Sequence, residues 1–472
     1  MKRVFYSAFA AAIISLSVSC STANNDGFVD LFNGKDFTGF EQLGGKGVFK
    51  VEDGMLIGVS TAKEPSSFMA TTKEYGDFIL EFDVWNDTLL NTGVQFRSHS
   101  RPEYREGRVH GYQCEIDPSD RAWSGGIYNE AVNGWLVPLI GNEKGQAAYK
   151  KYDWNHYRIE ALGNNIRIWL NGVCTSNLID DQESTGFIAF QIHSAGGEKI
   201  GRETKWKNIK IDTENVAEKL LQGELAPEIN NIPNTLSESE KADGWKLLFD
   251  GKTSNGWRNA HKDKFPESGW TIQDGIISIE ASGGGEATNA GDIVTIDQYS
   301  AFELKVDFKM SKGANSGIKY FVSEEEKFDP KHKASAFGLE FQILDDEVHK
   351  DAKLYTTYPG SRTMGSLYDM IPATEDKNYP KKANIDFRGR WNTAFIRALP
   401  SGHVEHWLNG EKVLEFERGS EEFRKRVHDS KYRAAMFNTG KKPFGEAEKG
   451  HILLQDHGNF VQFRNIKIRE LE

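Results

Sequence analysis

One stretch of the chain alternates polar and apolar residues in a way that would place acids on a single face of a β-strand. Within His-Gly-Tyr-Gln-Cys-Glu-Ile-Asp at 110–117, Gln113, Glu115 and Asp117 stand two residues apart. Side chains with that spacing point to the same side of a strand. Carboxylates are costly beneath a packed core but suit a ligand groove, where Glu115 could take up or release a proton. The alternative is an outward, solvated face.

A later stretch repeats this pattern with the acid and the amide exchanged. In Gly-Leu-Glu-Phe-Gln-Ile-Leu-Asp at 338–345, Glu340 and Gln342 take the matching places. His193 and His457 each follow a glutamine by two residues, and a neutral imidazole can accept a proton near neutral pH. These residues are therefore expected to share one kind of sheet face in both stretches, although a lone histidine is often structural.

Arg97 is expected to bring a positive charge to the same face in the first half of the chain. It lies two residues after Gln95 on a neighbouring predicted strand. There it could hold hydroxyl groups or a developing negative charge, and Val322, read as its counterpart, could not.

Aromatic residues in polar loops could stack on the flat face of a sugar, or simply cap the edge of the fold. The substrate-binding candidates are Tyr128, Tyr368, Trp123 and Trp135. Four other tryptophans fall in strand patterns and are expected in the core: Trp154, Trp169, Trp391 and Trp407.

No regular spacing of histidines or cysteines marks a metal site. Asp117, Asp120, Glu115 and His110 could form an oxygen-rich cation site, so the cofactor is unknown and a divalent cation stays open. There is no Gly-rich phosphate loop and no Ser-centred nucleophile elbow. The net charge of −11, without a concentration of Lys and Arg, argues against nucleic acid as a partner.

An internal repeat supplies the architecture that must position these residues. Seven segments recur in the same order and cover both halves of the chain. The pairs are 30–40 with 247–257, 51–54 with 272–275, 91–95 with 315–319, 154–155 and 169–172 with 391–392 and 407–410, 191–193 with 455–457, and 207–211 with 464–468. The chain is therefore predicted to contain two copies of one domain, at 27–212 and 244–472.

The repeated segments carry the signals of β-strands. Residues 78–84 and 302–308 alternate apolar and polar, and 158–170 reads as a hairpin turning at Gly163-Asn-Asn165. Many short strands with almost no helical periodicity predict an all-β sandwich in each copy. Residues 213–243 read as a linker, with a short helix at 216–222 followed by a solvated stretch.

Together these segments resemble one family. The Leu-Phe-Asp-Gly-Lys opening at 248–252, Asn315-Ser-Gly-Ile318, Trp407-Leu-Asn-Gly410 and the closing Leu-Gln-Asp-His-Gly at 454–458 are similar to the 3-keto-disaccharide hydrolase family, also described as 3-keto-glucoside 1,2-lyase/2-hydroxyglucal hydratase. The resemblance implies two tandem concanavalin-like jelly-roll sandwiches and an enzyme that acts on 3-keto-glycosides.

The resemblance also implies a reaction. A ketone at C3 acidifies the proton on C2, so a base such as Glu115 or His193 could remove it, and the bond from C1 to the glycosidic oxygen would then break. Hydration would complete a net hydrolysis, and a separate oxidoreductase would supply the keto sugar. A two-carboxylate glycosidase using Glu115 and Asp117, and a non-catalytic carbohydrate-binding module, are the alternatives.

The N-terminus reads as an export signal. Lys2 and Arg3 precede an apolar run too short to span a bilayer, and small residues lead to Cys20, which resembles the lipidated residue of a lipoprotein. The chain is expected at the cell envelope, anchored through Cys20 and facing the periplasm from the outer membrane. Cys114 and Cys174 either pair as a disulfide or remain buried thiols.

Overall fold

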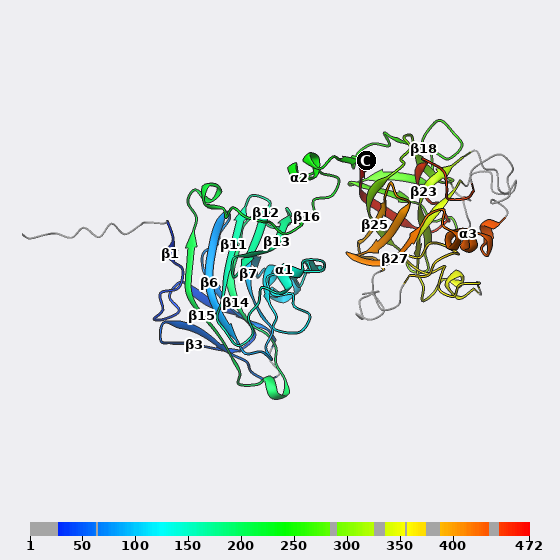
Figure 1. Ribbon diagram of the computed structural model, residues 1–472. Coiled ribbons are helices and arrows are strands. Elements are labelled where there is room, and N and C mark those ends of the chain that lie inside the picture. The colour runs from blue at the N-terminus through cyan, green and yellow to red at the C-terminus, as the bar shows by residue number, and fades with distance from the viewer. Residues whose placement is uncertain are drawn as a thin grey trace, which may run out of the picture.

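Two β-sandwiches with the same strand order make up the chain in a computed structural model, which describes residues 27–62, 65–283, 290–324, 336–354, 356–373, 388–433 and 443–472. The proposed signal at 1–20, with Cys20, lies outside these residues. Each copy forms a larger and a smaller sheet (Figure 1). This confirms the predicted pair of tandem jelly-roll sandwiches. No helix in the described ranges is long and apolar enough to cross a membrane.

In the first copy, hereafter copy 1, nearly all neighbouring strands are antiparallel. The larger sheet runs β3 (Val48–Glu52), β4 (Met55–Val59), β15 (Glu203–Asp212), β6 (Phe78–Asn86), β11 (Asn155–Leu162), β12 (Asn165–Leu170), β13 (Val173–Ile179) and β16 (Glu228–Asn230), with β1 (Val29–Asp30) on β15. The smaller sheet runs β2 (Phe40–Gly44), β5 (Ser67–Thr71), β14 (Phe187–Ile192), β7 (Thr92–His99), β8 (His110–Ile116), β9 (Ile127–Glu130) and β10 (Gly134–Val137).

The second copy, hereafter copy 2, repeats this order. Its larger sheet runs β19 (Trp270–Gln273), β20 (Ile276–Ile279), β29 (Val461–Glu470), β22 (Phe302–Met310), β25 (Asn392–Ala398), β26 (His403–Leu408) and β27 (Glu411–Glu417), with β17 (Trp245–Leu247) on β29. The smaller sheet runs β18 (Trp257–Asn259), β21 (Ile293–Thr295), β28 (His451–Leu454), β23 (Asn315–Ser323) and β24 (Phe337–Leu344). The strands of the two copies can therefore be compared residue by residue.

Helices are short and lie outside the sheets. They are the 3-10 turns η1 (Arg105–Gly107), η2 (Gly197–Lys199), η3 (Val216–Lys219) and η4 (Lys350–Lys353), and the α-helices α1 (Glu143–Gln146), α2 (Glu238–Ala242) and α3 (Glu421–His428). The predicted alternating strands are β6 and β22, and the predicted hairpin is β11–β12, with Gly163 at φ +53° in its turn. These local predictions are confirmed.

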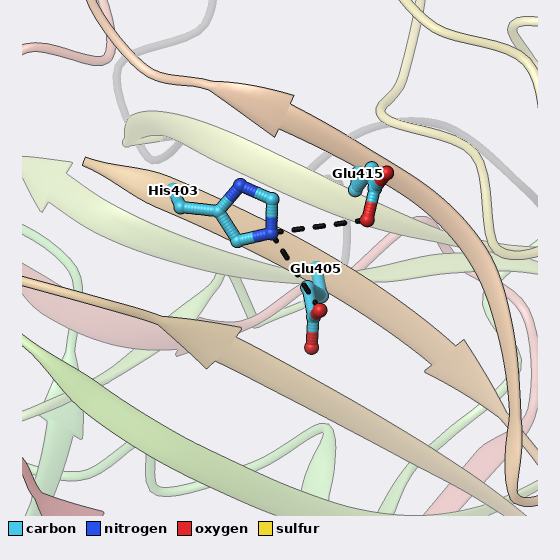
Figure 2. Close-up of side chains that lie close together, drawn as sticks. All are labelled: His403, Glu405 and Glu415. Atoms are coloured by element: carbon cyan, nitrogen blue, oxygen red, sulfur yellow. Dashed lines mark ion pairs between the residues drawn. The ribbon is translucent and has the colours of Figure 1, made fainter. Parts of the chain in front are cut away.

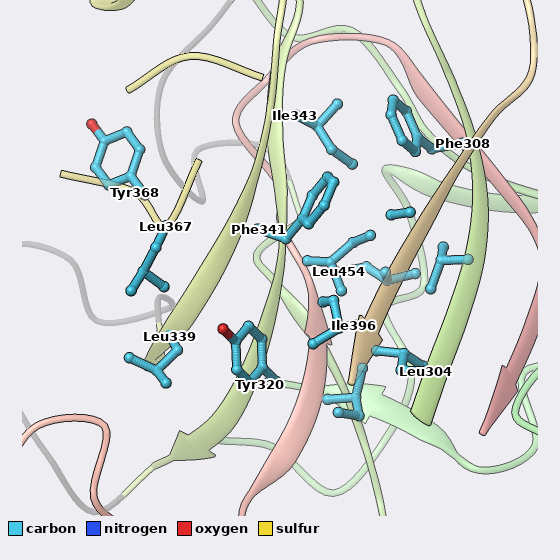
Figure 3. Close-up of a cluster of buried hydrophobic side chains, with 14 of the residues drawn as sticks. Leu304, Phe308, Tyr320, Leu339, Phe341, Ile343, Leu367, Tyr368, Ile396 and Leu454 are labelled. Carbon is cyan, nitrogen blue, oxygen red and sulfur yellow. The ribbon is translucent and has the colours of Figure 1, made fainter. Parts of the chain in front are cut away.

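Each copy has its own core between its two sheets. Strand alternation puts every second side chain there, so in copy 2 Phe341, Ile343 and Leu454 from the smaller sheet meet Leu304 and Ile396 from the larger one (Figure 3). The remaining side chains of the smaller sheet then face away from the core. This second face carries the site described below.

The segment between the copies, which was predicted to be a linker, contains short elements of regular structure. β16 pairs in parallel with β13 of copy 1, while α2 opens with a capping box formed by Ser237 and Glu240. The Asn234 side chain donates to Gly275 O and accepts from Asn465 N in copy 2. The asparagine and serine side chains of this segment thus form hydrogen bonds with backbone N–H and C=O groups.

The prediction that four tryptophans lie in the core is confirmed for Trp169, which is buried in a small cluster of its own, and is wrong for the other three. Trp154, Trp391 and Trp407 are only half-buried, and Trp169 packs with Cys174 and Ala226 outside the main core of copy 1. Their polar partners are Lys207 for Trp154, Arg464 for Trp391, Glu160 for Trp169 and Glu405 for Trp407. An indole ring can lie on the outer face of a sheet when a cation covers the ring or a carboxylate accepts a hydrogen bond from its N–H.

Cys114 and Cys174 are both free, which decides against the disulfide alternative. Cys114 lies in the core of copy 1, and Cys174 lies beside Trp169.

Candidate functional site

The polar face of β8 lies where the alternation predicted it. Tyr112, Cys114 and Ile116 are fully buried in the core of copy 1, so Gln113 and Glu115 point to the other side of the smaller sheet. Both are nonetheless almost inaccessible to solvent. Glu115 is therefore a carboxylate outside the core that the surrounding loops still shield from bulk water.

A row of amides holds the Glu115 carboxylate in place. Gln95 Nε2 donates to Gln113 Oε1 at 2.6 Å, and Gln113 Nε2 donates to Glu115 Oε2 at 2.8 Å. Asn91 Nδ2 donates to Glu115 Oε1 at 2.5 Å. Burial raises the pKa of Glu115, and the amide bonds oppose that shift. A carboxylate with a raised pKa is a stronger base than one in water, so Glu115 suits proton transfer.

Arg121 joins Glu115 to Asp117 and was missed by the sequence reasoning. Its Nε and Nη2 donate to Asp117 Oδ2 at 3.0 and 2.7 Å, and Nη2 lies 3.5 Å from Glu115 Oε1. The guanidinium lies 4.9 Å from the ring of Trp123 and 4.8 Å from that of Trp135. Arg121 sits in a loop without periodicity, so only its spacing of four residues from Asp117 could have signalled the pair.

Tyr128 completes the copy 1 cluster on the neighbouring strand. It lies opposite Gln113 in the β8–β9 pairing, and its ring is 5.2 Å from that of Trp135. Burial, followed by the charges of Glu130 and Glu115, raises the pKa of its hydroxyl. Tyr128 therefore stays protonated at neutral pH and can donate a hydrogen bond.

Arg97 does not join this cluster, which corrects its predicted role. A bulge after Phe96 puts Arg97 at φ +44° and turns its side chain away, with 1% of the residue exposed. Its Nε donates to Gly76 O and its Nη1 to Gly163 O, so it serves as a structural link. Copy 2 has the same bulge with Phe321 at φ +50°, so the counterpart of Arg97 is Phe321, not Val322.

His193 is not brought into contact with Glu115. It lies just beyond the end of β14, is exposed, and its Nδ1 contacts Ser194 O. His110 lies at the start of β8, with its ring 4.1 Å from that of Tyr104. Neither histidine has a contact with the carboxylates of the β8 face among those in the described residues.

Copy 2 places a carboxylate at the centre of the equivalent face. Glu340 stands opposite Lys319 in the β23–β24 pairing, and both side chains point away from the core. Lys319 Nζ donates to Ala336 O and lies 3.5 Å from Asp292 Oδ2. The buried ammonium and the acids around it form a charged centre where copy 1 has amides.

Of the remaining predicted residues of copy 2, Tyr368 contacts this centre. Tyr368 donates its backbone N–H to Glu340 O and its hydroxyl to Asp351 Oδ2 at 2.7 Å, and burial raises the pKa of that hydroxyl. His457 lies with its ring 6.4 Å from that of His349, whose pKa is lowered by burial. Copy 2 therefore places a tyrosine beside Glu340, whereas copy 1 places a tyrosine and an arginine beside Glu115.

The residues of copy 1 that were proposed as cation ligands do not form a cation site. Arg121 already neutralises Glu115 and Asp117, and the exposed Asp120 pairs with Lys151. In the described residues, a group with metal-like spacing occurs at His403, Glu405 and Glu415 in copy 2 (Figure 2). Lys412 Nζ lies 2.6 Å from Glu415 and 3.4 Å from Glu405, so this cluster is an ion-pair network on β26 and β27.

Comparison with known proteins gives both copies the same relationship. A family model for the 3-keto-alpha-glucoside-1,2-lyase-like domain matches residues 27–212 and again 244–469. A 3-keto-disaccharide hydrolase from Bacteroides thetaiotaomicron is 38% identical over 242 residues, which are 49% of this chain and 80% of that protein.

Two crystal structures of candidate glycosyl hydrolases from Parabacteroides distasonis also match. They are 32% and 27% identical, with TM-scores of 0.41 and 0.33, and they cover 51% and 48% of this chain and 100% and 99% of their own. Because the family model matches most of the chain, in two tandem domains, the protein belongs to the 3-keto-alpha-glucoside-1,2-lyase-like domain family.

Proposed function

We propose that this chain cleaves 3-keto-glycosides by elimination followed by hydration, and that Glu115 of copy 1 is the base. Membership of the family makes the chain an enzyme that acts on glycosides. The route of cleavage and the residues that perform it are the parts proposed here.

The observation that carries the proposal is the Glu115 carboxylate itself. It is buried outside the core, is oriented by Asn91 and Gln113, and has a pKa raised by burial. Such a group can remove the C2 proton, which the C3 carbonyl acidifies, at neutral pH. The electron pair of the C–H bond then forms the enolate, and reforming the carbonyl expels the glycosidic oxygen from C1.

Two neighbours of Glu115 can serve the charges that develop in this step. The Tyr128 hydroxyl, held protonated, can donate to the departing oxygen. Arg121 replaces Arg97 as the positive group near the enolate, because its guanidinium lies beside Glu115. Addition of water to the C1–C2 double bond, with the oxygen joining C1 and a proton joining C2, completes a net hydrolysis.

A two-carboxylate glycosidase mechanism has less support. It needs a second carboxyl group free to act as acid, base or nucleophile. Asp117 accepts two hydrogen bonds from Arg121 and further bonds from Ser119, so it is committed to holding the loop. The Glu115 carboxylate with its raised pKa, beside the protonated phenol of Tyr128, fits the elimination mechanism better than the two-carboxylate mechanism.

The proposal includes the place where the enzyme works and the source of its substrate. We propose that Cys20 carries a lipid that anchors the chain at the periplasmic side of the outer membrane, and that a separate oxidoreductase makes the C3 ketone. Replacement of Cys20 by Ser should move the chain from the membrane fraction to the soluble fraction, and unchanged fractionation would exclude the anchor.

The test compares methyl 3-keto-α-D-glucoside with methyl α-D-glucoside as substrates of the full mature chain. Only the keto sugar should be cleaved, and Glu115→Gln should lower kcat by about 10²-fold or more. Asp120→Asn, at an exposed ion pair, is the matched control and should keep full activity. Equal cleavage of both sugars would favour a conventional glycosidase, and unchanged turnover by Glu115→Gln would remove it as the base.

A further inference from the structure

Each smaller sheet has a glycine at the middle of its outer face. Gly93 on β7 stands opposite Glu115 on β8, and the β7–β14 pairing puts Gln191 on its other side. In copy 2, Gly317 stands opposite Gln342, and Gln455 donates its backbone N–H to Gly317 O. Each glycine thus leaves a flat patch on the outer face of its sheet, hereafter the floor, which is flanked by a glutamine from β14 or from the end of β28.

These two glutamines share an unusual feature. Gln191 and Gln455 are 1% and 4% exposed, and the Oε1 atom of each accepts no hydrogen bond from the described residues. A buried acceptor without a donor is destabilising, and nearly all such groups in folded proteins have a partner. The same exception at equivalent positions of two copies points to a donor that comes from a ligand.

The backbone of both glutamines is held in the same way. The Thr92 hydroxyl donates to Gln191 O at 2.5 Å, and the Ser316 hydroxyl donates to Gln455 O at 2.8 Å. The backbone of each glutamine is therefore fixed on its strand while its buried side-chain oxygen has no donor among the described residues. This is the arrangement expected of a preorganised binding group.

The glycine leaves room for a second polar side chain above the floor. A Cβ atom at Gly93 would lie 2.5 Å from Gln113 Cδ, and one at Gly317 would lie 2.5 Å from Glu340 Oε1. The two floors therefore carry different central groups, an amide in copy 1 and a carboxylate in copy 2. In copy 2, Gln342 Oε1 is a second buried acceptor without a donor in the described part of the chain.

We infer that the chain has two separate sugar sites, over Gly93 and Gly317, in which Gln191 and Gln455 each accept a hydrogen bond from a sugar hydroxyl. The choice of sugar as ligand rests on the proposed function; the need for a hydroxyl or other donor does not. Copy 2 has a buried amide oxygen without a donor among the described residues on each side of its glycine, so it recognises a pair of hydroxyls on one ring. Copy 1 presents one open oxygen and the Glu115 carboxylate.

The test titrates the full mature chain with methyl α-D-glucoside, which lacks the C3 ketone and so is not cleaved by the proposed route. Calorimetry and ligand-observed NMR should give two sites per chain. Gln191→Met and Gln455→Met should each weaken one site by about tenfold or more and leave the other unchanged. One site in the parent chain, no binding at all, or two unaltered sites in both variants would overturn the inference.

Stability separates a binding role from a structural one. Methionine has nearly the volume of glutamine but no unsatisfied oxygen, so both variants should keep or raise the Tm of the chain. Gln42→Met is the control, because Gln42 Nε2 donates to Gly45 O and Gly47 O, and its loss should lower the Tm without changing binding. A clear fall in Tm for Gln191→Met and Gln455→Met would mark them as structural residues instead.

Failure of this inference can be told apart from failure of the proposed function. Glu115→Gln should lower turnover of the keto sugar by about 10²-fold or more and leave the copy 2 site unchanged. Two binding sites in a chain that cleaves no 3-keto-glycoside would uphold the inference and refute the proposed function. Cleavage of the keto sugar by a chain that has only one binding site would uphold the proposed function and refute the inference.

Discussion

A buried histidine should make the stability of copy 2 depend on pH. The Tyr320 hydroxyl on β23 lies 2.7 Å from His406 Nε2 on β26, and His406 Nδ1 lies 3.1 Å from Gly365 O. These distances fit a neutral ring that accepts from the tyrosine and donates to the carbonyl. Both side chains are fully buried, and burial lowers the pKa of His406 from 6.5 to about 4.

The sign and size of the effect follow from that pKa. Because the folded pKa lies below the unfolded one, the unfolded chain binds more protons between pH 4 and 6.5. Stability is therefore complete above pH 6.5 and falls as the pH drops toward 4. A shift of about 2.5 units corresponds to roughly 3 kcal/mol in total, of which about 2 kcal/mol is lost by pH 5.

Copy 1 supplies the matched control for this prediction. The repeat aligns Phe96 with Tyr320 and Ile168 with His406, and both copy 1 residues are buried. The double variant Tyr320→Phe with His406→Ile should remove the extra pH dependence without leaving an unpaired hydroxyl in the core.

Hydrogen exchange followed by mass spectrometry at pH 7 and pH 5, corrected for intrinsic exchange rates, can report the two copies separately through peptides from β12 and β26. On going to pH 5, the β26 peptide should lose more protection in the parent chain than in the double variant, and the β12 peptide should behave alike in both. Equal pH dependence of β26 in the two proteins, or a His406 NMR titration near pH 6.5, would refute the reasoning.

Three further changes have outcomes that the contacts predict. Arg121→Gln removes a positive charge that lowers the pKa of Glu115, so the acidic limb of the plot of kcat/KM against pH should move to higher pH. An unchanged acidic limb would show that Arg121 does not set the pKa of the catalytic base. Gly317→Ala places a Cβ against the Glu340 carboxylate and should weaken ligand binding in copy 2 alone, as calorimetry would show. Ser237→Ala removes the α2 capping box and should cost about 1 kcal/mol in urea unfolding, with no effect on turnover.

Strand alternation made most of the fold predictable. The outward direction of Gln113 and Glu115 follows from the period of two, because Tyr112 and Cys114, which alternate with them, enter the core. The repeat then transferred this assignment to Glu340 and Gln342 without further information.

Irregular features were the ones that sequence reasoning placed wrongly or missed. Arg97 lies in a bulge, and one extra residue in a strand changes the side to which side chains point. Arg121 lies in a loop, where spacing along the chain says little about direction. Trp154, Trp391 and Trp407 were expected in the core because they fall in strand patterns, yet a cation over the ring or a carboxylate that accepts the N–H lets a half-buried indole lie on an outer face.

The sequence alone determines that this chain is two copies of one β-sandwich and which strand residues can face a ligand, because periodicity and repetition are local and visible in the order of residues. The tertiary structure decides which of those residues act together. It sets Arg121 between Glu115 and Asp117, and it leaves the Gln191 and Gln455 side-chain oxygens without donors among the described residues. Such facts depend on contacts between strands and loops far apart in the chain, and no local pattern encodes them.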